Sequence, residues 1–271
     1  MRNSAINGIH TTFDSMNKKY IRDLQVIENK KLNSEYFELI LAPEEPLPEI
    51  LPGQFAEIRI PETFLRRPIS FYDVDYEDNR FSFLIQIVGK GTYKLSTREV
   101  GENLNIIFPL GNSFHMEGVK HPLLIGGGVG IAPLLFLGHN MADLGINPTF
   151  LLGFRTKELI VDLTLFEEYG EVCTTTDDGS AGERGVVTDH SILKNPNPDF
   201  DMIYTCGPEV MMKAVSELAV SLDIKAQASL ENTMACGFGA CLCCVQKTHH
   251  GNRMVCTDGP VFNTRELIWQ T

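Results

Sequence analysis

The sequence predicts an antiparallel β-barrel, then an α/β domain with a parallel sheet, then a small C-terminal metal-cluster subdomain. Three observations predict this order. The N-terminal third alternates apolar and polar residues in short runs between prolines and glycines, which is typical of antiparallel strands. The middle third alternates strand-like and helix-like segments, which indicates a parallel sheet. The C-terminal part holds four of the seven cysteines at spacings that suit metal ligands.

The expected division of the chain follows from these changes of pattern. We expect a loose N-terminal tail over residues 1–19, a barrel over 20–117, a nucleotide-binding domain over 118–226 and a cluster subdomain over 227–271. The formal net charge of −12 argues against a nucleic-acid partner and a polybasic membrane patch. The sequence contains no run of 18 or more apolar residues, so we expect no membrane span. The first twenty residues lack the apolar region of a signal peptide. Seven cysteines, four of them spaced as ligands, indicate a reducing cytoplasm.

The alternation within the barrel region is clear near residue 58. Ala56, Ile58 and Ile60 alternate with Glu57 and Arg59. This pattern predicts a half-buried strand, with the two charged residues on its polar side.

Two loops of the barrel region carry residues that suit phosphate. In the segment 66–70, Arg67 offers a bidentate fork and Ser70 a small donor and acceptor. In the segment 89–92, glycines precede Thr92, which we expect to be the N-cap of a short helix. Alone, a surface arginine pair and a plain turn explain these loops at least as well. Together in one barrel, they resemble two sides of a pyrophosphate cradle.

A glycine-rich turn follows the first strand of the middle region. Residues 122–125 form a buried strand, and residues 126–133 open a helix that runs to about Leu144. The turn departs from G-x-G-x-x-G because its third position is Pro133, which suits a first helical turn. The next strand ends in Arg155, where the usual fingerprint has an acidic residue. We therefore interpret it as a phosphate-approach turn of another subclass, with a turn that binds no ligand as the less favoured interpretation.

A second turn is expected at the same edge of the parallel sheet. Strands are predicted over 149–154, 171–176 and 202–205, and ligands bind outside the carboxyl ends of such strands. The last of these strands ends at Cys206-Gly207-Pro208. A cysteine there is usually a small buried hydrophobe. Its place beside Gly207 also suits contact with a nicotinamide ring.

The C-terminal cysteines have the spacing C-x4-C-x2-C, then eleven residues, then C, which is the plant-type spacing for a [2Fe–2S] cluster. These ligands are Cys236, Cys241, Cys244 and Cys256. Gly237 and Gly239 suit the tight loop, because glycine reaches positive φ. A structural zinc site is the main alternative. Cys243 could replace Cys244 as a ligand, although the spacing favours Cys244.

The two redox sites require a third cofactor between them. A nicotinamide delivers a two-electron hydride, whereas a [2Fe–2S] cluster accepts one electron at a time. A flavin can accept two electrons together and release them one at a time. We therefore expect FAD on the barrel loops.

The order of modules over roughly residues 20–271 resembles the ferredoxin–NADP reductase superfamily, and within it the electron-transfer subunits of class 1B dihydroorotate dehydrogenases. The resemblance implies FAD contacts at Arg67, Pro68, Ile69, Ser70, Gly91 and Thr92, NAD(H) contacts at Gly127, Gly128, Gly130, Pro133 and Gly207, and a catalytic contact at Cys206. Many relatives carry an aromatic residue where this chain has Ile69.

The resemblance also implies a partner and a direction of electron flow. An FMN-containing dihydroorotate dehydrogenase catalytic subunit would oxidise dihydroorotate in pyrimidine biosynthesis, and electrons would pass through the cluster and FAD to NAD⁺ in a heterotetramer. The same modules resemble small subunits of NADH-dependent ferredoxin–NADP⁺ oxidoreductases and of some hydrogenases. A third hypothesis is a non-catalytic redox sensor or zinc-stabilised binding protein, which would lack flavin. NADH is favoured over NADPH by the family alone, since Arg155 could also meet a 2′-phosphate.

Overall fold

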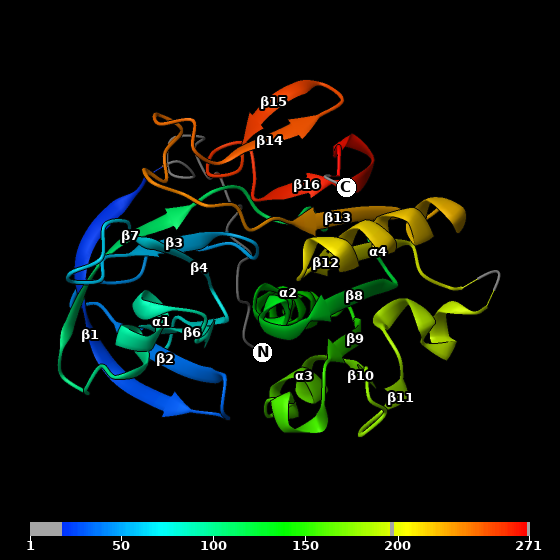
Figure 1. Cartoon of the computed structure of the whole chain (residues 1–271), viewed down its shortest axis with the longest axis horizontal. Helices are drawn as coiled ribbons and strands as arrows, with labels where there is room; N and C mark the ends of the chain where they lie inside the picture. Colours follow the sequence, from blue (N-terminus) through cyan, green and yellow to red (C-terminus); the bar gives the residue numbers. More distant parts are fainter. Residues whose placement is uncertain (1–17, 196–197, 270–271) are drawn as a thin grey trace, which may run out of the picture.

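A computed structural model of the protein describes residues 18–195 and 198–269. The expected N-terminal tail therefore lies outside the described residues, apart from Lys18 and Lys19. Figure 1 shows a barrel and a parallel sheet side by side, with the C-terminal segment lying across the top of both. In the part of the chain that the structure describes, no helix has the length and apolar character needed to cross a membrane.

The barrel is a single seven-stranded antiparallel sheet with the order β4-β3-β7-β1-β2-β6-β5. Its strands are β1 (Tyr20–Lys31), β2 (Tyr36–Ala42), β3 (Phe55–Ile58), β4 (Arg67–Ser70), β5 (Asp73–Asp75), β6 (Arg80–Gln86) and β7 (Asn103–Leu110). The edge strands β4 and β5 are joined by Phe71 and Tyr72 alone. The N–H of Phe71 donates to Gln54 and that of Tyr72 to Ser82, so the two edges of the sheet meet.

The short helix α1 (Lys90–Ser96) begins differently from the expectation. The N-cap is Gly89, with extended backbone, and Thr92 is the third helical residue. The hydroxyl of Thr92 accepts hydrogen bonds from the N–H groups of Val88 at 2.9 Å and Gly89 at 3.2 Å. The prediction of Thr92 as the N-cap is therefore wrong, because its side chain reaches back to the cap from inside the first turn.

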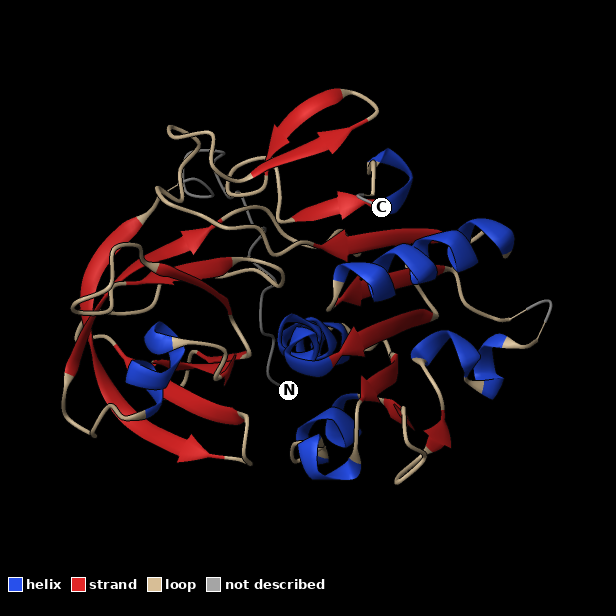
Figure 2. Cartoon of the chain, viewed as in Figure 1, coloured by secondary structure: helices blue, strands red, loops and turns tan. Residues whose placement is uncertain are grey.

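The second sheet has the order β11-β10-β9-β8-β12-β13-β16 and is parallel except for β16. Its strands are β8 (Pro122–Gly127), β9 (Thr149–Phe154), β10 (Glu171–Thr176), β11 (Glu183–Arg184), β12 (Met202–Cys206), β13 (Lys225–Ser229) and β16 (Val261–Asn263). The helices are α2 (Ala132–Asp143), α3 (Thr164–Tyr169) and α4 (Glu209–Ser221), with 3-10 turns η1 (Gly128–Ile131), η2 (Lys157–Leu159), η3 (Val187–Asp189), η4 (Ser191–Leu193) and η5 (Thr264–Glu266). Helices α2 and α3 cover one face of the sheet and α4 the other (Figure 2).

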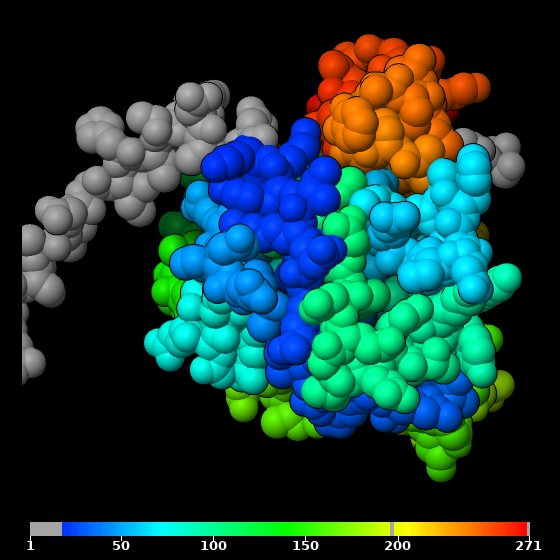
Figure 3. Space-filling model, turned by 90° about the vertical axis from the view of Figure 1, so that its left-hand side faces the viewer, coloured from blue at the N-terminus to red at the C-terminus, as the bar shows by residue number. Residues whose placement is uncertain are grey.

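The cluster subdomain is tied to both larger domains. Its hairpin consists of β14 (Val245–Thr248) and β15 (Gly251–Met254), while β16 pairs antiparallel with β13 at the edge of the parallel sheet. The Asn112 amide joins it to the barrel, donating to the carbonyls of Asp258 and Val261 and accepting from the Val261 N–H, all at 2.9 Å. In Figure 3 the orange C-terminal segment lies directly on the blue and cyan barrel strands.

This contact overturns one expectation for β3. Glu57, predicted on the polar side of a half-buried strand, has no exposed surface. The side chains of β3 do alternate between two faces, but the cluster subdomain covers the face that the sequence pattern predicts to be exposed. A period-2 pattern cannot reveal that a later segment of the chain covers a strand.

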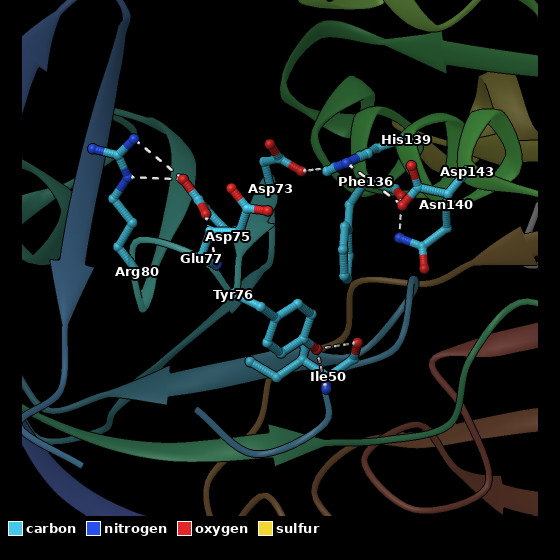
Figure 4. Close-up of polar contacts among 10 residues, drawn as sticks. All are labelled: Ile50, Asp73, Asp75, Tyr76, Glu77, Arg80, Phe136, His139, Asn140 and Asp143. Atoms are coloured by element: carbon cyan, nitrogen blue, oxygen red, sulfur yellow. Dashed lines mark hydrogen bonds and ion pairs between the residues drawn. The ribbon is translucent and has the colours of Figure 1, made fainter. Parts of the chain in front are cut away.

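Helix α2 lies between the barrel and the sheet and contributes to the cores of both. Phe136 packs with the barrel residues, and His139 faces β5 (Figure 4). The Nδ1 atom of His139 lies 2.7 Å from the Asp73 carboxylate, and its ring stacks on Tyr169 with centroids 4.7 Å apart. This hydrogen bond raises the pKa of His139 above its usual value of 6.5.

We expect His139→Gln to destabilise the protein more at about pH 6 than at about pH 9. Because the folded pKa is raised, the stabilisation is complete below pH 6.5 and is lost as the pH rises through the folded pKa. The difference in free energy of unfolding should be about 1 kcal/mol at the acid end, measured by urea denaturation. Asp143→Asn removes an exposed carboxylate that lies 3.8 Å from Nε2 and also raises the pKa of His139, so it should give a smaller effect with the same pH dependence. Equal destabilisation at both pH values would contradict this account.

Candidate redox-cofactor site

The two predicted turns of the parallel sheet are in contact. In the register of β8 and β12, Cys206 pairs with Gly126, so both strands end at the same edge. A Cβ atom on Gly130 would lie 2.4 Å from the Cα of Gly207 and 2.5 Å from the carbonyl oxygen of Cys206. Only glycine fits here. The order of the sheet reverses between these two strands, which is where such sheets bind ligands.

A cavity of about 1150 Å³ opens at this edge. It is large enough for a dinucleotide, since pockets for smaller ligands measure about 300–1,000 Å³. Four of the predicted residues line it, namely Gly127, Gly128, Gly130 and Gly207. Pro133 does not line it and is buried in the first turn of α2. The cavity extends from Arg155 and Asp177 to Trp269 of the cluster subdomain.

Arg155 is already engaged at the rim of this cavity. Its Nη2 lies 2.5 Å from the carboxylate of Glu35, which belongs to the barrel side of the domain boundary. The Arg155 guanidinium therefore already forms an ion pair, and a phosphate that bound here would compete with the Glu35 carboxylate.

Cys206 lies behind the cavity wall. Its side chain is fully buried, and burial raises the pKa of its thiol well above the usual value. A thiol in this state is a packing group and not a nucleophile. Its predicted contact with a nicotinamide ring stays a prediction.

The two barrel loops that suit phosphate are adjacent. A Cβ atom on Gly91 would lie 2.8 Å from Nε of Arg67, so the guanidinium lies against the start of α1. Nη1 of Arg67 donates to the carbonyl of Leu65 at 2.6 Å, which helps fix its orientation. A guanidinium held against the first turn of a helix is the kind of donor that a pyrophosphate needs. These residues therefore fit FAD.

The residues around β4 divide between two environments. Pro68 and Ser70 line a second cavity of about 190 Å³, together with Glu231. Ile69 packs against the barrel core.

We expect Gly91→Ala to weaken FAD binding at least tenfold, because the new methyl group must displace the Arg67 guanidinium (about 1.4 kcal/mol). FAD retention during gel filtration and the flavin dissociation constant would measure this. Gly89→Ala is the matched control, since its Cβ would meet nothing within 4 Å and its backbone is extended. If both variants bind FAD equally well, Arg67 does not hold the cofactor in this way.

Glu231 joins the two cavities and was missed by the sequence analysis. It lines both of them. The Glu231 side chain is accessible from the cavities. The protein around it nevertheless removes water from its carboxyl group, and this desolvation raises the pKa of the carboxyl. Its carboxyl also helps to raise the pKa of the Cys206 thiol. The available signal was its place two residues after the end of β13, and the alanines of β13 make that strand hard to recognise from the sequence.

The cluster loop has the backbone that the sequence predicts. Gly237 and Gly239 have φ of 72° and 83°. Burial acts to raise the pKa of the Cys236 thiol, but hydrogen bonds from the backbone N–H groups of Phe238, Cys241 and Ala240 and from the Cys241 thiol lower it to about 7. Inward-pointing N–H groups of this kind stabilise thiolates and bridging sulfides.

The ligand-spaced cysteines form two pairs. The Cys241 thiol is close enough to Cys236 to help lower the pKa of Cys236, and the Cys244 thiol is close enough to Cys256 to help raise the pKa of Cys256. Burial and the Cys244 thiol raise the pKa of Cys256 to about 12. Among the described residues, no group of three or more Cys, His, Asp or Glu surrounds a single point as a zinc site would. Two pairs suit two irons, so the donor set fits a [2Fe–2S] cluster better than one metal ion.

Cys243 and Cys244 point in different directions. Cys244 is 2% exposed and its sulfur accepts from the N–H of Cys256 at 3.4 Å. Cys243 is exposed and lines the larger cavity. The geometry favours Cys244 as the ligand, in agreement with the spacing.

A barrel with a phosphate cradle, a parallel sheet with a glycine turn and a four-cysteine loop define a class. They are the parts of an oxidoreductase of the ferredoxin-reductase fold that carries an iron–sulfur domain. Residues 124–217 match the oxidoreductase NAD-binding domain, and residues 231–268 match the iron–sulfur cluster binding domain of dihydroorotate dehydrogenase B.

The chain belongs to the family of dihydroorotate dehydrogenase B electron transfer subunits. It is 36% identical over 258 residues to the dihydroorotate dehydrogenase B (NAD(+)) electron transfer subunit of Bacillus cereus strain B4264, over 91% of this chain and 98% of the relative. The subunit of Bacillus anthracis strain CDC 684 has the same identity and coverage.

Solved structures agree with this assignment and confirm the predicted fold class. The chain matches a structure of an NADH-dependent reduced ferredoxin-NADP oxidoreductase with a TM-score of 0.84 and 32% identity, over 91% of this chain and 90% of that one. The ferredoxin reductase of carbazole 1,9a-dioxygenase shares the fold, with a TM-score of 0.66 and 22% identity over 76% and 67% of the chains.

Proposed function

We propose that this chain is the electron-transfer subunit of an NAD-dependent dihydroorotate dehydrogenase. Electrons enter from an FMN-containing catalytic subunit and pass through the [2Fe–2S] cluster and FAD to NAD⁺. The observation that carries the proposal is the position of Glu231. It lines both the cavity at the glycine turn and the cavity at Ser70, and it stands five residues before Cys236 in the chain.

The cofactors divide the chemistry, because FAD exchanges a hydride with NAD(H) and single electrons with the cluster. In this proposal Arg67 and the start of α1 bind the FAD pyrophosphate, and Ser70 contacts the flavin. The glycine turn and Gly207 admit the dinucleotide to close contact with the backbone. Glu231 lies at the junction of the two cavities, where its carboxyl group would face both cofactors.

The catalytic partner is proposed to dock on the cluster loop. Phe238 and Leu242 project from this loop with 55% and 63% of their surfaces exposed. Apolar side chains beside an electron-transfer centre suit a protein interface, where a short path is needed. We propose a heterotetramer in which this loop faces the FMN subunit.

Three further points belong to the proposal. The division at residues 20–117, 118–226 and 227–271 describes the FAD, NAD and cluster parts. NADH is preferred, because Glu35 already neutralises Arg155. All seven cysteines are free, which supports a reducing cytoplasm as the location.

A second function has a specific observation in its favour. The match to the NADH-dependent reduced ferredoxin-NADP oxidoreductase covers nine-tenths of both chains. In that case the same chain would serve a partner that does not oxidise dihydroorotate.

An anaerobic assay separates the two functions. The chain is purified with an FMN-type dihydroorotate dehydrogenase subunit, dihydroorotate is added, and NADH formation is followed. Rapid NADH formation that is lost in the Cys236→Ser variant would support both the FMN subunit as the partner and the electron route through the cluster. If no complex forms but NADH still bleaches the flavin and cluster bands, the modules are as proposed and the partner is different.

A further inference from the structure

Glu57 is a charged residue in an apolar contact. It lies at the middle of β3, between Pro68 of β4 and Ile107 of β7. Phe55, two residues earlier on the same face, belongs to the apolar cluster that includes Cys244 and Cys256. The Glu57 side chain therefore projects from the barrel into its contact with the cluster subdomain.

The Glu57 carboxyl group has no polar partner. Neither Oε1 nor Oε2 has a hydrogen bond within the described part of the chain, and the residue has no exposed surface. Burying a polar group without a hydrogen-bond partner destabilises the fold. A fold that keeps such a group usually does so for function.

The carboxyl group lies directly against the cluster loop. A Cβ atom on Gly237 would be 2.9 Å from the carboxyl carbon of Glu57 and 3.0 Å from Oε2. Gly237 follows the ligand Cys236, so the carboxyl group is next to the part of the loop that holds one iron.

Arg66 provides the balancing charge from the opposite side. Its Nη1 donates to the carbonyl of Glu57 at 3.2 Å and to that of Asn105 at 3.0 Å, while Nη2 bonds to the Asn105 side chain at 2.6 Å. Burial raises the pKa of the Glu57 carboxyl group and lowers that of the Arg66 guanidinium, and the attraction between the two charges partly offsets both shifts. Arg66 is fixed by its own hydrogen bonds and does not contact the carboxylate directly.

We propose that Glu57 lowers the reduction potential of the [2Fe–2S] cluster, acting through its carboxylate, which lies against the cluster loop at Gly237. This inference rests on the proposed function, because it requires the cluster to be present. Reduction adds one electron to an already negative cluster, and a nearby buried carboxylate opposes that addition. The effect lowers the potential and makes the reduced cluster a stronger donor to FAD.

The test is a potentiometric titration of the purified full-length holoprotein, followed by the EPR signal of the reduced cluster. It is made at several pH values up to about 9, because the ionised form of a carboxyl group whose pKa is raised gains population as the pH rises. We expect Glu57→Gln to raise the midpoint potential by an amount equal to about a tenfold change in the equilibrium constant, or about 59 mV for one electron. Glu57→Asp keeps the charge and should keep the potential close to that of the wild type.

Glu38→Gln is the matched control. Glu38 is another barrel carboxyl whose pKa is raised by burial, but it lies on β2, which takes no part in the contact with the cluster subdomain. Its loss should leave the cluster potential unchanged.

Each result has a distinct meaning. An unchanged potential in Glu57→Gln, or equal shifts in Glu57→Gln and Glu38→Gln, overturns the inference while the proposed function stands. Loss of the cluster from Glu57→Gln but not from Glu57→Asp also overturns it, because Glu57 would then act in assembly of the loop. Absence of iron and sulfide from the wild-type protein would instead contradict the proposed function.

Discussion

We expect Cys244→Ser to remove the [2Fe–2S] cluster and Cys243→Ser to leave it in place. The adjacent thiols differ in direction, since Cys244 is buried against Cys256 and Cys243 opens on the cavity. A serine oxygen is a poor substitute for a buried thiolate ligand, so iron and sulfide content should fall close to zero. Electron transfer to NAD⁺ should fall at least about 100-fold. Loss of a residue that only hydrogen-bonds to a metal ligand costs about 10–100-fold, and loss of the ligand itself should cost more.

The neighbouring variant makes the comparison sharp. Cys243→Ser changes the same kind of atom one residue away, and it should retain the visible and EPR spectra of the cluster. Iron analysis of both variants, purified under anaerobic conditions, provides the measurement. A cluster that survives in Cys244→Ser and disappears in Cys243→Ser would reverse the assignment.

The second large effect is expected from Gly130→Ala. The added methyl group would meet the backbone of Gly207 and Cys206 at 2.4–2.5 Å, and backbone atoms cannot turn away as a side chain can. The two turns must separate, which misplaces the dinucleotide relative to the flavin. A displacement of about 1 Å costs about 100-fold in rate, so NADH should reduce the flavin at least that much more slowly. The overpacking should also cost about 1–3 kcal/mol of stability.

Stopped-flow reduction by NADH, compared with reduction by dithionite, isolates this effect. Dithionite needs no nucleotide site and should reduce the Gly130→Ala flavin and cluster as fast as in the wild type. Gly89→Ala, whose new methyl group meets nothing, should behave as the wild type in both reactions. Normal reduction of Gly130→Ala by NADH would mean that the dinucleotide binds elsewhere.

Local patterns predicted much of this molecule because the physics that they report is local. The alternation around Ala56 reports a strand directly. The order of strand and helix in the middle third allows few sheet topologies, and right-handed crossovers select among them. The spacing of the cysteines reflects the geometry of one loop, which is why Gly237 and Gly239 have the expected positive φ.

The features that the sequence did not predict depend on distant segments. Glu57 was expected on a polar face, and only the packing of a segment 180 residues later buries it. Glu231 follows a strand of weak pattern, and its importance depends on where two cavities meet. Thr92 was assigned to the cap because its hydroxyl fits either position, and the choice depends on the extended backbone of Gly89. The direction of Cys243 likewise follows from the loop, where Leu242 has a φ of 57°.

The strand β16 has a consequence for how the protein is made. Among the described strands it comes last in sequence order, it lies five residues beyond Cys256, and it covers the edge of β13. The sheet that binds the dinucleotide is therefore incomplete until synthesis has passed residue 263. A chain released before that point would leave the β13 edge unpaired, and exposed edges invite aggregation. Truncated products of this protein should therefore be lost to aggregation even when their glycine turn is intact.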